Sequence, residues 1–551
     1  MKLINGLPIN KLNGNNLKGD LTGGFSAAIV ALPLALAFGV LSGAGPMAGI
    51  YAAIFVGFFA SLTGGTASQI SGPTGPMTIL MTAIFMQYTT ADPVHGVAIA
   101  FTVVMLGGLF LILFGIFRIS QYINMIPHPV ISGLMSGLGL TIILLQLGPL
   151  LGHANAGTPW DSLLQLPNAI AHPATEAALI GLSALVLVYF QPKSIGKYIP
   201  SPLTALILGT ISYLLLFPES MVQTIGEIST SLPMPQWPVF NPELLIDMVK
   251  SALALAVLGT IDTLMTSLVA DNISRDHHDS DQELVGQGIA NIFSGLFSGI
   301  AGAGTSMCTV VNVRHGGQTP LSGIFHALII LLLFLLLSQY IHLIPHAALA
   351  AILIKVASDL IDWDYIKRLH KAPKAAIVIM FTVLLLTLFI DLIIAIGTGI
   401  TIASLLYMKR MSDLQLEKTS VITHPEEEHP LSEQESDFLQ KAKGRILLFH
   451  VSGPMSFGAA KSMVKRVASV DNYEALVLDL SDVPLIDFTS SVAIEDIILD
   501  AQEAGHHIFI SGARDAVKET LTQQGILSLL LDGHEYENRL DALHHASNLL
   551  D

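Results

Sequence analysis

Charged residues are scarce in this sequence and unevenly distributed. They make up 12% of its 551 residues, whereas soluble domains carry roughly a quarter. Before residue 412, 16 Lys and Arg against 18 Asp and Glu give a net charge of −2; from 412 onward, 10 against 24 give −14. So acidic a surface argues against nucleic acid as a partner. The chain therefore combines a charge-poor apolar part with an acidic, soluble part.

Cysteine is nearly absent too. The single residue, Cys308, excludes an internal disulfide bond and a metal site built from several cysteines. No Gly-rich segment carries the lysine of a nucleotide-binding P-loop, which argues against an ATP-driven pump. No Ser/His/Asp set has the local signature of an enzyme family, so the sequence does not predict an enzyme. Residues 1–20 are polar and do not resemble a cleaved signal peptide.

Long apolar runs fill the first 411 residues. A membrane helix needs about 20 mostly apolar residues. About fourteen segments qualify, some of them too short to span alone: 23–42, 47–63, 94–117, 124–151, 174–191, 199–217, 248–270, 319–341, 344–360, 375–391 and 392–408, with 73–88, 284–300 and 304–313 broken by glycine or polar residues. The sequence therefore predicts a polytopic α-helical membrane protein whose transmembrane body covers 21–411.

The positions of Lys and Arg test this count, because cytoplasmic loops are enriched in them. With the N-terminus inside, every loop predicted to lie outside lacks both residues: 43–47, 89–93, 152–173, 218–247 and 338–345. Lys250 and Lys355 lie within apolar segments, and we expect them to snorkel toward an interface. We predict a multi-pass protein of the cell inner (plasma) membrane. The N-terminal segment 1–20 and the C-terminus are then both cytoplasmic.

A faint internal repeat links the two halves of the body. The glycine-rich stretch 57–65 is similar to 295–304, and each is followed by a polar break, at 71–76 and at 304–306. Seven segments per half, an odd number, give the halves opposite orientations. This predicts a 7+7 inverted repeat with two broken half-helices and a binding site between the breaks.

A helix that begins inside the membrane suits an anion. Its first N–H groups are unpaired and lie at the positive end of the helix dipole. Candidate residues for contact with a small inorganic anion are those at the two breaks: Thr74, Gly75, Ala303, Gly304, Thr305 and Ser306. The alternative is that the glycines only allow close helix packing.

Asp262 is an acidic residue inside an apolar segment. No basic residue lies within a helical turn of it, and a lone carboxylate at that depth costs about 2.5–3.5 kcal/mol on insertion scales. Thr266 follows one turn later on the same helix face. Three interpretations remain open: Asp262 and Thr266 bind a hard cation together with oxygens of the 304–306 break, Asp262 carries a proton, or Asp262 is structural.

The C-terminal part changes pattern. Residues 412–442 form a polar stretch that we interpret as a linker. From 443 to 551, buried-strand patterns at 445–451, 475–480 and 508–511 alternate with helical ones at 459–469, 490–504 and beyond Arg514. This predicts one small α/β domain.

Several strings in the sequence are distinctive. They are ALPLALAFG (31–39), SGPTGPMT (71–78), TSLVADNI (266–273), QEL (282–284), GQG (286–288), GAG (302–304), VVNV (310–313) and TPLSG (319–323), with DLS (479–481) and IDFTS (486–490) near the C-terminus. The first eight resemble the SulP family of sulfate-permease-type anion transporters, and within it the cyanobacterial sodium-dependent bicarbonate transporters. The last two resemble a STAS domain.

The resemblance implies a fold, a cofactor and partners. It implies fourteen segments in core and gate domains, a homodimer in the membrane lipid, and sodium ion as the coupling cofactor. Sodium would bind at Asp262, Thr266, Gly304 and Thr305, with the anion near Thr74 and the second break. Met307 stands where some animal relatives have arginine, and Gly72 where the bicarbonate transporter has glutamate.

From the residues and the resemblance we predict sodium-coupled bicarbonate symport. Two alternatives stay open: a proton-coupled symporter of sulfate or a dicarboxylate, and a membrane sensor that signals through the STAS domain to a regulatory protein. The sequence contains no kinase, DNA-binding or other output domain, which disfavours a sensor.

Thr489 is a candidate regulatory residue. It lies two residues after Asp487, which resembles the phosphorylation motif of anti-sigma-antagonist STAS domains. A hydroxyl at the start of a helix is also an ordinary N-cap. Both interpretations remain open.

Overall fold

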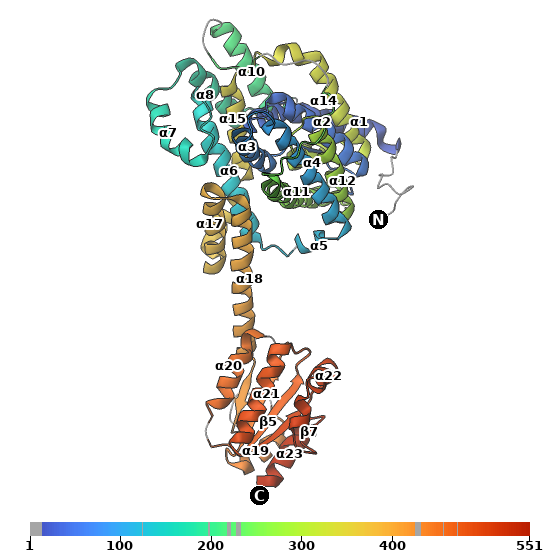
Figure 1. The fold of residues 1–551 in the computed structure, drawn as a ribbon, viewed down its shortest axis with the longest axis vertical. Coiled ribbons are helices and arrows are strands. Elements are labelled where there is room, and N and C mark those ends of the chain that lie inside the picture. Colours follow the sequence, from blue (N-terminus) through green and yellow to red (C-terminus); the bar gives the residue numbers. More distant parts are fainter. Residues whose placement is uncertain are drawn as a thin grey trace. The chain divides into compact units, whose positions relative to one another are not determined.

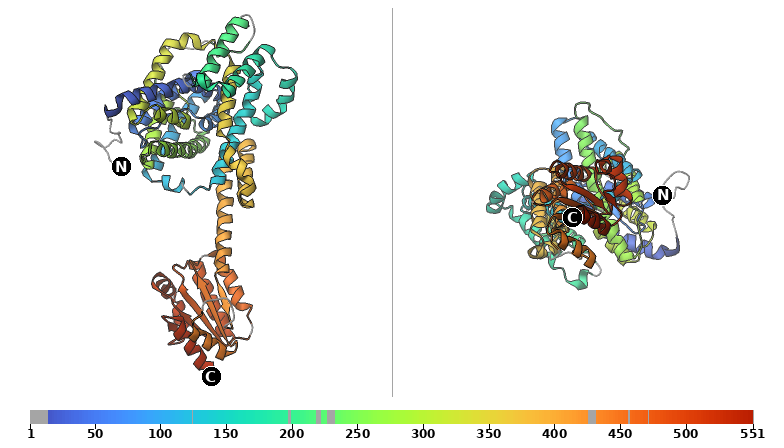
Figure 2. Two further views of the ribbon diagram at one scale, coloured as in Figure 1. Left: turned by 180° about the vertical axis from the view of Figure 1, so that it is seen from behind. Right: turned by 90° about the horizontal axis from the view of Figure 1, so that it is seen from below.

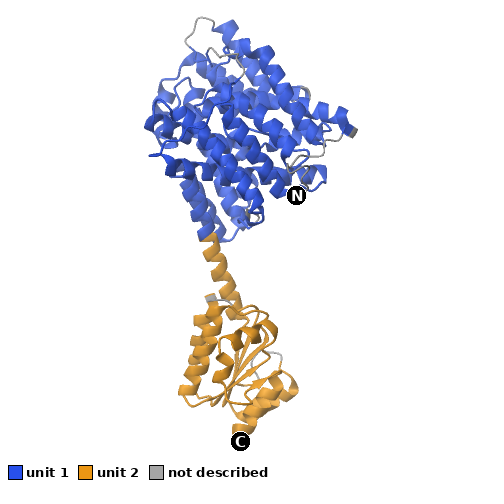
Figure 3. Cartoon of the chain, turned by 45° about the vertical axis from the view of Figure 1, so that its right-hand side comes forward, with its two compact units in different colours: residues 1–401 blue, residues 402–551 orange. Residues whose placement is uncertain are grey.

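The structure is a computed structural model that describes residues 14–123, 125–196, 199–217, 222–226, 233–424, 431–455, 457–470 and 472–550. The chain forms two compact units, residues 1–401 and residues 402–551 (Figure 3). Each unit has its own architecture, and the helix α18 (Leu392–Glu417) contributes residues to both.

The first unit is a body of helices. They are α1 (Leu17–Leu41), α2 (Pro46–Thr63), α3 (Gly75–Ala91), α4 (Gly96–Ile116), α5 (Ser120–Ile123), α6 (His128–Leu150), α7 (Pro159–Ala171), α8 (Thr175–Phe190), α9 (Lys193–Gly196), α10 (Ser201–Leu216), α11 (Leu245–Ser274), α12 (Ser280–Leu296), α13 (Ser306–Arg314), α14 (Pro320–Ile341), α15 (His346–Leu360), α16 (Trp363–Arg368), α17 (Lys374–Phe389) and the start of α18. Each of the fourteen predicted segments overlaps one of these helices. Among the described residues, seven helices are long and apolar enough to cross a membrane, or up to eight if the bent pair α7 and α8 is one span.

The helix α7 is a feature that the sequence analysis missed. It lies in the stretch 152–173, which was expected to be a loop. The Thr158 hydroxyl caps it by accepting from the Asp161 N–H, and Pro159 occupies its first turn. It has 13 residues, and Asp161, Ser162, Gln165 and Asn168 interrupt its apolar residues, so it fails the criterion of a long apolar run.

Within the first unit, α12 packs against α2 and α4, and α1 packs against α14 (Figure 1). A second set of contacts joins α6, α8, α15 and α17. Glycine allows the closest of these approaches: a Cβ on Gly288 of α12 would lie 2.5 Å from the Gly108 oxygen of α4, and the reverse distance is also 2.5 Å. The two helices therefore touch backbone to backbone there.

Both polar breaks are visible in the first unit. The chain of the first break forms the short strand β1 (Ser71–Gly72), and α3 begins three residues later. The second break forms β2 (Ala303–Gly304), which α13 follows. β1 and β2 pair antiparallel, with Ser71 opposite Gly304 and Gly72 opposite Ala303. This pairing brings the starts of α3 and α13 together in the interior.

The second unit is a five-stranded sheet with helices on both faces (Figure 2). Its strands are β3 (Ser420–Ile422), β4 (Ile446–Ser452), β5 (Ala475–Asp482), β6 (His507–Ser511) and β7 (Glu535–Tyr536), in that spatial order. β3 pairs antiparallel with β4, and the other pairs are parallel. The helices are α19 (Glu433–Ala442), α20 (Phe457–Ala468), α21 (Phe488–Glu503), α22 (Asp515–Gln523) and α23 (Arg539–Leu550).

Alternation along the central strands builds a core on each face of this sheet. Leu476 and Leu478 of β5 join one cluster with residues of α20, α21 and α22. Ala475 and Val477 join the other cluster with residues of α19 and α23. A period of two sends successive side chains to opposite faces, so the apolar run in β5 serves both layers.

The structure differs from the expected linker at 412–442. This stretch contains the end of α18, the edge strand β3 and the helix α19, all within the second unit. Ser432 and Glu435 form a capping box at the start of α19, and Leu439 is fully buried against the sheet. The many polar residues of α19 cover its solvent face, which explains why composition alone resembled a linker.

Candidate functional site

The first break is held against α11 by its N-cap residue. Thr74 caps α3, and its Oγ1 accepts from the Met77 N–H at 3.4 Å. The same hydroxyl donates to Oδ2 of Asp262 at 2.6 Å. The intramembrane carboxylate therefore meets the start of a half-helix directly, although the two residues are 188 positions apart in sequence.

The second break contacts the same helix one turn further on. Thr266 Oγ1 donates to the Gly304 carbonyl oxygen at 3.0 Å and lies 2.8 Å from Ser306 Oγ. The Gly304 N–H donates to Thr263 Oγ1 at 3.2 Å. Asp262 and Thr266 lie one turn apart on α11. Asp262 contacts the first break and Thr266 contacts the second.

A cavity of about 280 Å³ lies where the two breaks meet α11. Five of the six predicted anion-contact residues line it, together with Asp262: Thr74, Gly75, Gly304, Thr305 and Ser306. Its apolar wall includes Leu34 and Phe38 of α1 and Val356 and Leu360 of α15. A concave, mostly apolar site with a few convergent polar groups is typical of a small-ligand site.

Two predicted residues lie behind the cavity wall. Ala303 is in β2 and pairs with Gly72, so its backbone shapes the break. Thr266 is fully buried and reaches the cavity through Ser306 and Gly304. The hydroxyl of Thr305 faces the opposite break, where it donates to the Ile70 oxygen at 2.8 Å. The structure therefore brings together all the residues predicted to contact the anion or the cation, some at the cavity surface and some behind it.

The two half-helices point their N-terminal ends at this cavity. Gly75 and Pro76 of α3 line it, and so do Ser306, Met307 and Cys308 of α13. The first N–H groups of a helix have no acceptor within the helix, and the helix dipole makes this end positive. The cavity thus combines two positive helix ends with the carboxylate and hydroxyl oxygens of α11, a set that suits an anion beside a small hard cation.

One charged residue of the cavity was missed by the sequence analysis. Asp359 of α15 lines the cavity, and Lys355 one turn earlier holds it, with Nζ 2.5 Å from Oδ1. The sequence contains a signal for it, because Lys355 is a basic residue inside an apolar segment and Asp359 stands at the (i, i+4) position. The pair is a local neutral unit rather than a free charge in the cavity.

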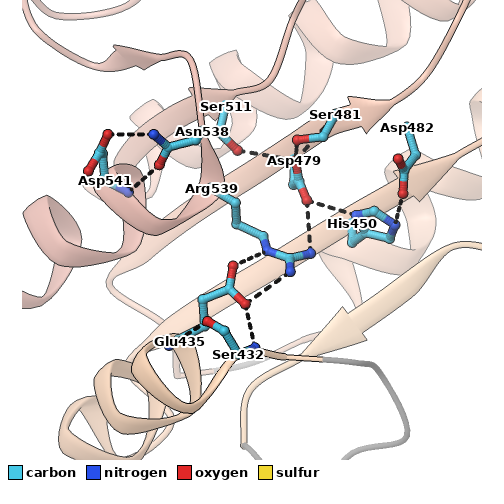
Figure 4. A network of polar contacts seen from close by, with 10 residues as sticks. All are labelled: Ser432, Glu435, His450, Asp479, Ser481, Asp482, Ser511, Asn538, Arg539 and Asp541. Atoms are coloured by element: carbon cyan, nitrogen blue, oxygen red, sulfur yellow. Dashed lines mark hydrogen bonds and ion pairs between the residues drawn. The ribbon is translucent and has the colours of Figure 1, made fainter.

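The second unit contains a charged network of its own, drawn in Figure 4. Arg539 of α23 contacts Glu435 of α19, with Nε 2.8 Å from Oε1, and Asp479 of β5, with Nη1 3.2 Å from Oδ2. His450 of β4 lies 2.8 Å from Asp479 through Nδ1 and Oδ2. These contacts tie α19, two strands and α23 together.

The environment fixes the charges of this network. Burial alone would raise the pKa of Asp479, but hydrogen bonds from His450 and Ser481 outweigh it and lower that pKa to about 2. Burial also opposes ionisation of Glu435, yet Arg539 and the Ser432 N–H lower its pKa. Arg539 in turn has a raised pKa: burial disfavours its charge, but Glu435 and Asp479 more than compensate.

Of the two interpretations of Thr489, the structure contradicts the N-cap. The N-cap of α21 is Asp487, whose side chain accepts from the Ser490 N–H at 2.8 Å. Thr489 is the second residue of the helix, and its side chain is exposed. Asp caps a helix as well as Ser or Thr does, so the carboxylate two residues earlier takes that position and leaves the hydroxyl at the surface.

Comparison with known families assigns both units. The sequence profile of the sulfate permease family matches residues 17–383. This chain belongs to the sulfate permease family. The STAS domain profile matches residues 439–542, so the chain carries a C-terminal STAS domain, as the resemblance predicted. Its family consists of transporters, which confirms the expectation of a transporter and not an enzyme.

Individual relatives agree with this assignment. The chain is 44% identical over 538 residues to "Bicarbonate transporter BicA" of Synechocystis sp., an alignment that covers 98% of this chain and 95% of that protein. The solved transmembrane domain of a cyanobacterium bicarbonate transporter BicA matches 71% of this chain and all of its own, with a TM-score of 0.67 and 46% identity. Murine Solute Carrier 26 family member A9 in the inward-facing state covers 98% of this chain and 92% of its own at a TM-score of 0.82 and 18% identity, which supports the fold. The chain is therefore a multi-pass membrane transporter.

Proposed function

We propose that this transporter is a sodium-coupled bicarbonate symporter of the cell inner membrane. The observation that carries the proposal is the meeting of Asp262 with the N-cap of the first half-helix, at a cavity shared with the second. A relative 44% identical to it is named a bicarbonate transporter, which selects bicarbonate among small anions.

Each group of the site has a role in this proposal. Asp262 supplies the formal negative charge for sodium, and Thr266, the Gly304 carbonyl and Thr305 add neutral oxygens. The starts of α3 and α13, at Thr74–Gly75 and Ala303–Ser306, receive the anion at the positive ends of their helix dipoles. Bound sodium is then the positive partner of the anion, so neither ion binds well without the other.

The proposal extends to the arrangement in the membrane. The segments form a 7+7 inverted repeat, and both termini face the cytoplasm, as the distribution of Lys and Arg indicates. The helices α6, α8, α15 and α17 act as a gate domain that moves against a core carrying the two breaks. The transporter works as a homodimer in membrane lipid.

Uptake into proteoliposomes tests the function. Labelled bicarbonate and labelled sulfate are each offered with an inward sodium gradient or an inward proton gradient. We expect bicarbonate uptake that depends on sodium and is indifferent to the proton gradient. Sulfate uptake driven by protons alone would instead support the alternative of a proton-coupled symporter, to which the family description points. No uptake of either anion would favour a sensor.

Thr489 is proposed as a regulatory site on the STAS domain. It is exposed on the first turn of α21, where a phosphate would meet the positive end of the helix and add about −1.5 to −2 charges. Such a charge would alter contact with a regulatory protein. We expect Thr489→Glu to change the uptake rate while Thr489→Ser does not, measured at equal amounts of transporter in the membrane.

A further inference from the structure

Glu283 is a buried carboxylate of α12 that the proposed transport site does not use. Only 2% of the surface of Glu283 is exposed. Oε2 accepts from the backbone N–H groups of Gly65 at 2.8 Å and Thr66 at 2.9 Å. Oε1 accepts from Nε2 of Gln69 at 2.8 Å and Nε2 of Gln287 at 2.9 Å. All four partners are uncharged N–H groups.

Four donors around two oxygens match an ionised carboxylate, which only accepts hydrogen bonds. Bonds to a charged acceptor are stronger than those between neutral groups. Glu283 therefore fixes the backbone at Gly65 and Thr66, and with it the segment that leads from α2 into the first break.

The two glutamine partners of Glu283 connect it by hydrogen bonds to the elements that form the cation site. Gln69 Oε1 accepts from Ser267 Oγ at 2.9 Å, and Ser267 is the residue next to Thr266 on α11. Gln287 Nε2 also donates to Ser71 Oγ at 2.6 Å, and Ser71 is in β1 opposite Gly304. The Glu283 carboxylate is therefore linked to α11 through the Gln69 side chain and to the β1–β2 pair through the Gln287 side chain.

We propose that Glu283 is a positioning residue for the cation site. Its carboxylate orients Gln69 and Gln287, and these hold α11 and the first break in the register that places Asp262 and Thr266 beside Gly304. The inference rests on the proposed sodium-coupled function. It adds a residue that contacts neither the ion nor the anion and yet sets the affinity for sodium.

Replacement of Glu283 by glutamine tests its positioning role, because glutamine has nearly the same size and shape but no negative charge. In Glu283→Gln, an NH₂ group takes the place of one carboxylate oxygen. If it replaces Oε1, it faces the NH₂ groups of Gln69 and Gln287. Donors cannot face donors, so these amides must either lose their bond to residue 283 or turn, and a turned amide must reverse the direction of its bond to Ser267 or Ser71. We expect the sodium KM of bicarbonate uptake to rise about tenfold, as for other residues that orient metal ligands, with the maximal rate at saturating sodium retained.

Asp281→Asn is the matched control. Asp281 lies in the same first turn of α12, but its Oδ1 accepts from Ser120 Oγ, away from both breaks. Its sodium KM should equal that of the wild type. Hydrogen exchange supplies a second readout: the peptide covering 64–72 should exchange faster in Glu283→Gln and not in Asp281→Asn.

The outcomes separate this inference from the proposed function. A sodium KM equal to that of the wild type in Glu283→Gln, with sodium-driven uptake intact, overturns the positioning role and leaves the function standing. A lower maximal rate at unchanged KM would mean a purely structural role, and also overturns it. A wild type without sodium dependence rejects the function and the inference together. If Glu283→Gln does not accumulate, Ser267→Ala decides, because it removes the far end of the Gln69 path and should raise the sodium KM likewise.

Discussion

At the scale of single residues, the site depends on oxygen atoms brought together from distant parts of the chain. The sequence pointed to Asp262 because it is a carboxylate in an apolar run without a neighbouring cation. It also pointed to the threonines of the two breaks. It did not reveal that Thr74 donates to Asp262, or that Asp359 lines the cavity, because both facts depend on which helices pack side by side. Local spacing carries no such information.

Gly304 illustrates how tightly these atoms are packed. A Cβ on this residue would lie 2.6 Å from Gln69 Nε2 and 2.9 Å from Thr266 Cβ, closer than real Cβ contacts allow. We expect Gly304→Ala to displace both side chains and raise the sodium KM roughly tenfold. Gly397→Ala is the control, because its Cβ would meet nothing within 4 Å. Equal kinetics for Gly304→Ala and Gly397→Ala, measured as sodium-dependent uptake, would contradict the site.

At the scale of elements, apolar runs and turn signals located most helices and strands. The fourteen predicted segments and the central strands of the STAS domain all coincide with elements of the structure. Three of the missed elements, α7, α19 and β3, are short, and the two helices also contain several polar residues, so neither length nor hydropathy distinguishes these elements from loops. Their apolar residues become informative only when a sheet or a neighbouring helix is there to cover them.

The start of α21 gives a prediction at this scale. Asp487 accepts from the Ser490 N–H, whereas Thr489 is exposed beyond the cap. We expect Asp487→Ala to destabilise the STAS domain by about 1 kcal/mol, and Thr489→Ala to change its stability by less than about 0.5 kcal/mol. The measurement is the urea dependence of hydrogen-exchange protection in α21 of the full-length protein. A larger loss in Thr489→Ala than in Asp487→Ala would restore the capping role to threonine.

At the scale of the whole molecule, charge separates the two units as composition indicated. The apolar body carries the breaks and the cavity, and the acidic unit forms a STAS domain with a two-faced core. Fold and family were accessible from sequence because they depend on long patterns and distinctive strings. The position of the domain boundary was not, since the edge strand β3 acquires its identity only by pairing with β4.

Acid should lower the free energy of unfolding of the STAS domain over a defined pH range. Asp479 has a pKa of about 2 against an ordinary value of 3.8, so its charged form is favoured in the folded state. That contribution, about 2 kcal/mol, is fully present above about pH 5 and is lost as the pH falls from about 4 toward 2. Glu435, whose pKa is also lowered, acts in the same direction.

Hydrogen exchange at β5 of the full-length protein measures this effect. Protection factors, corrected for the intrinsic pH dependence of exchange, should be constant from pH 7 to 5 and fall below pH 4. In Asp479→Asn the domain should be less protected at pH 7 and should have a flatter acid response. An acid response in Asp479→Asn as steep as that of the wild type would assign it to other carboxylates.

The central claim is that sodium and bicarbonate bind together where Asp262 meets the two half-helices. Coupling works in both directions, so a bicarbonate gradient must drive sodium. The decisive measurement is the uptake of labelled sodium into proteoliposomes against its own gradient, driven by an inward bicarbonate gradient. Our account predicts such uptake in the wild type and in Asp247→Asn, a carboxylate at the exposed start of the same helix, and none in Asp262→Asn. Sodium uptake at the wild-type rate in Asp262→Asn, or no bicarbonate-driven sodium uptake in the wild type, would contradict it.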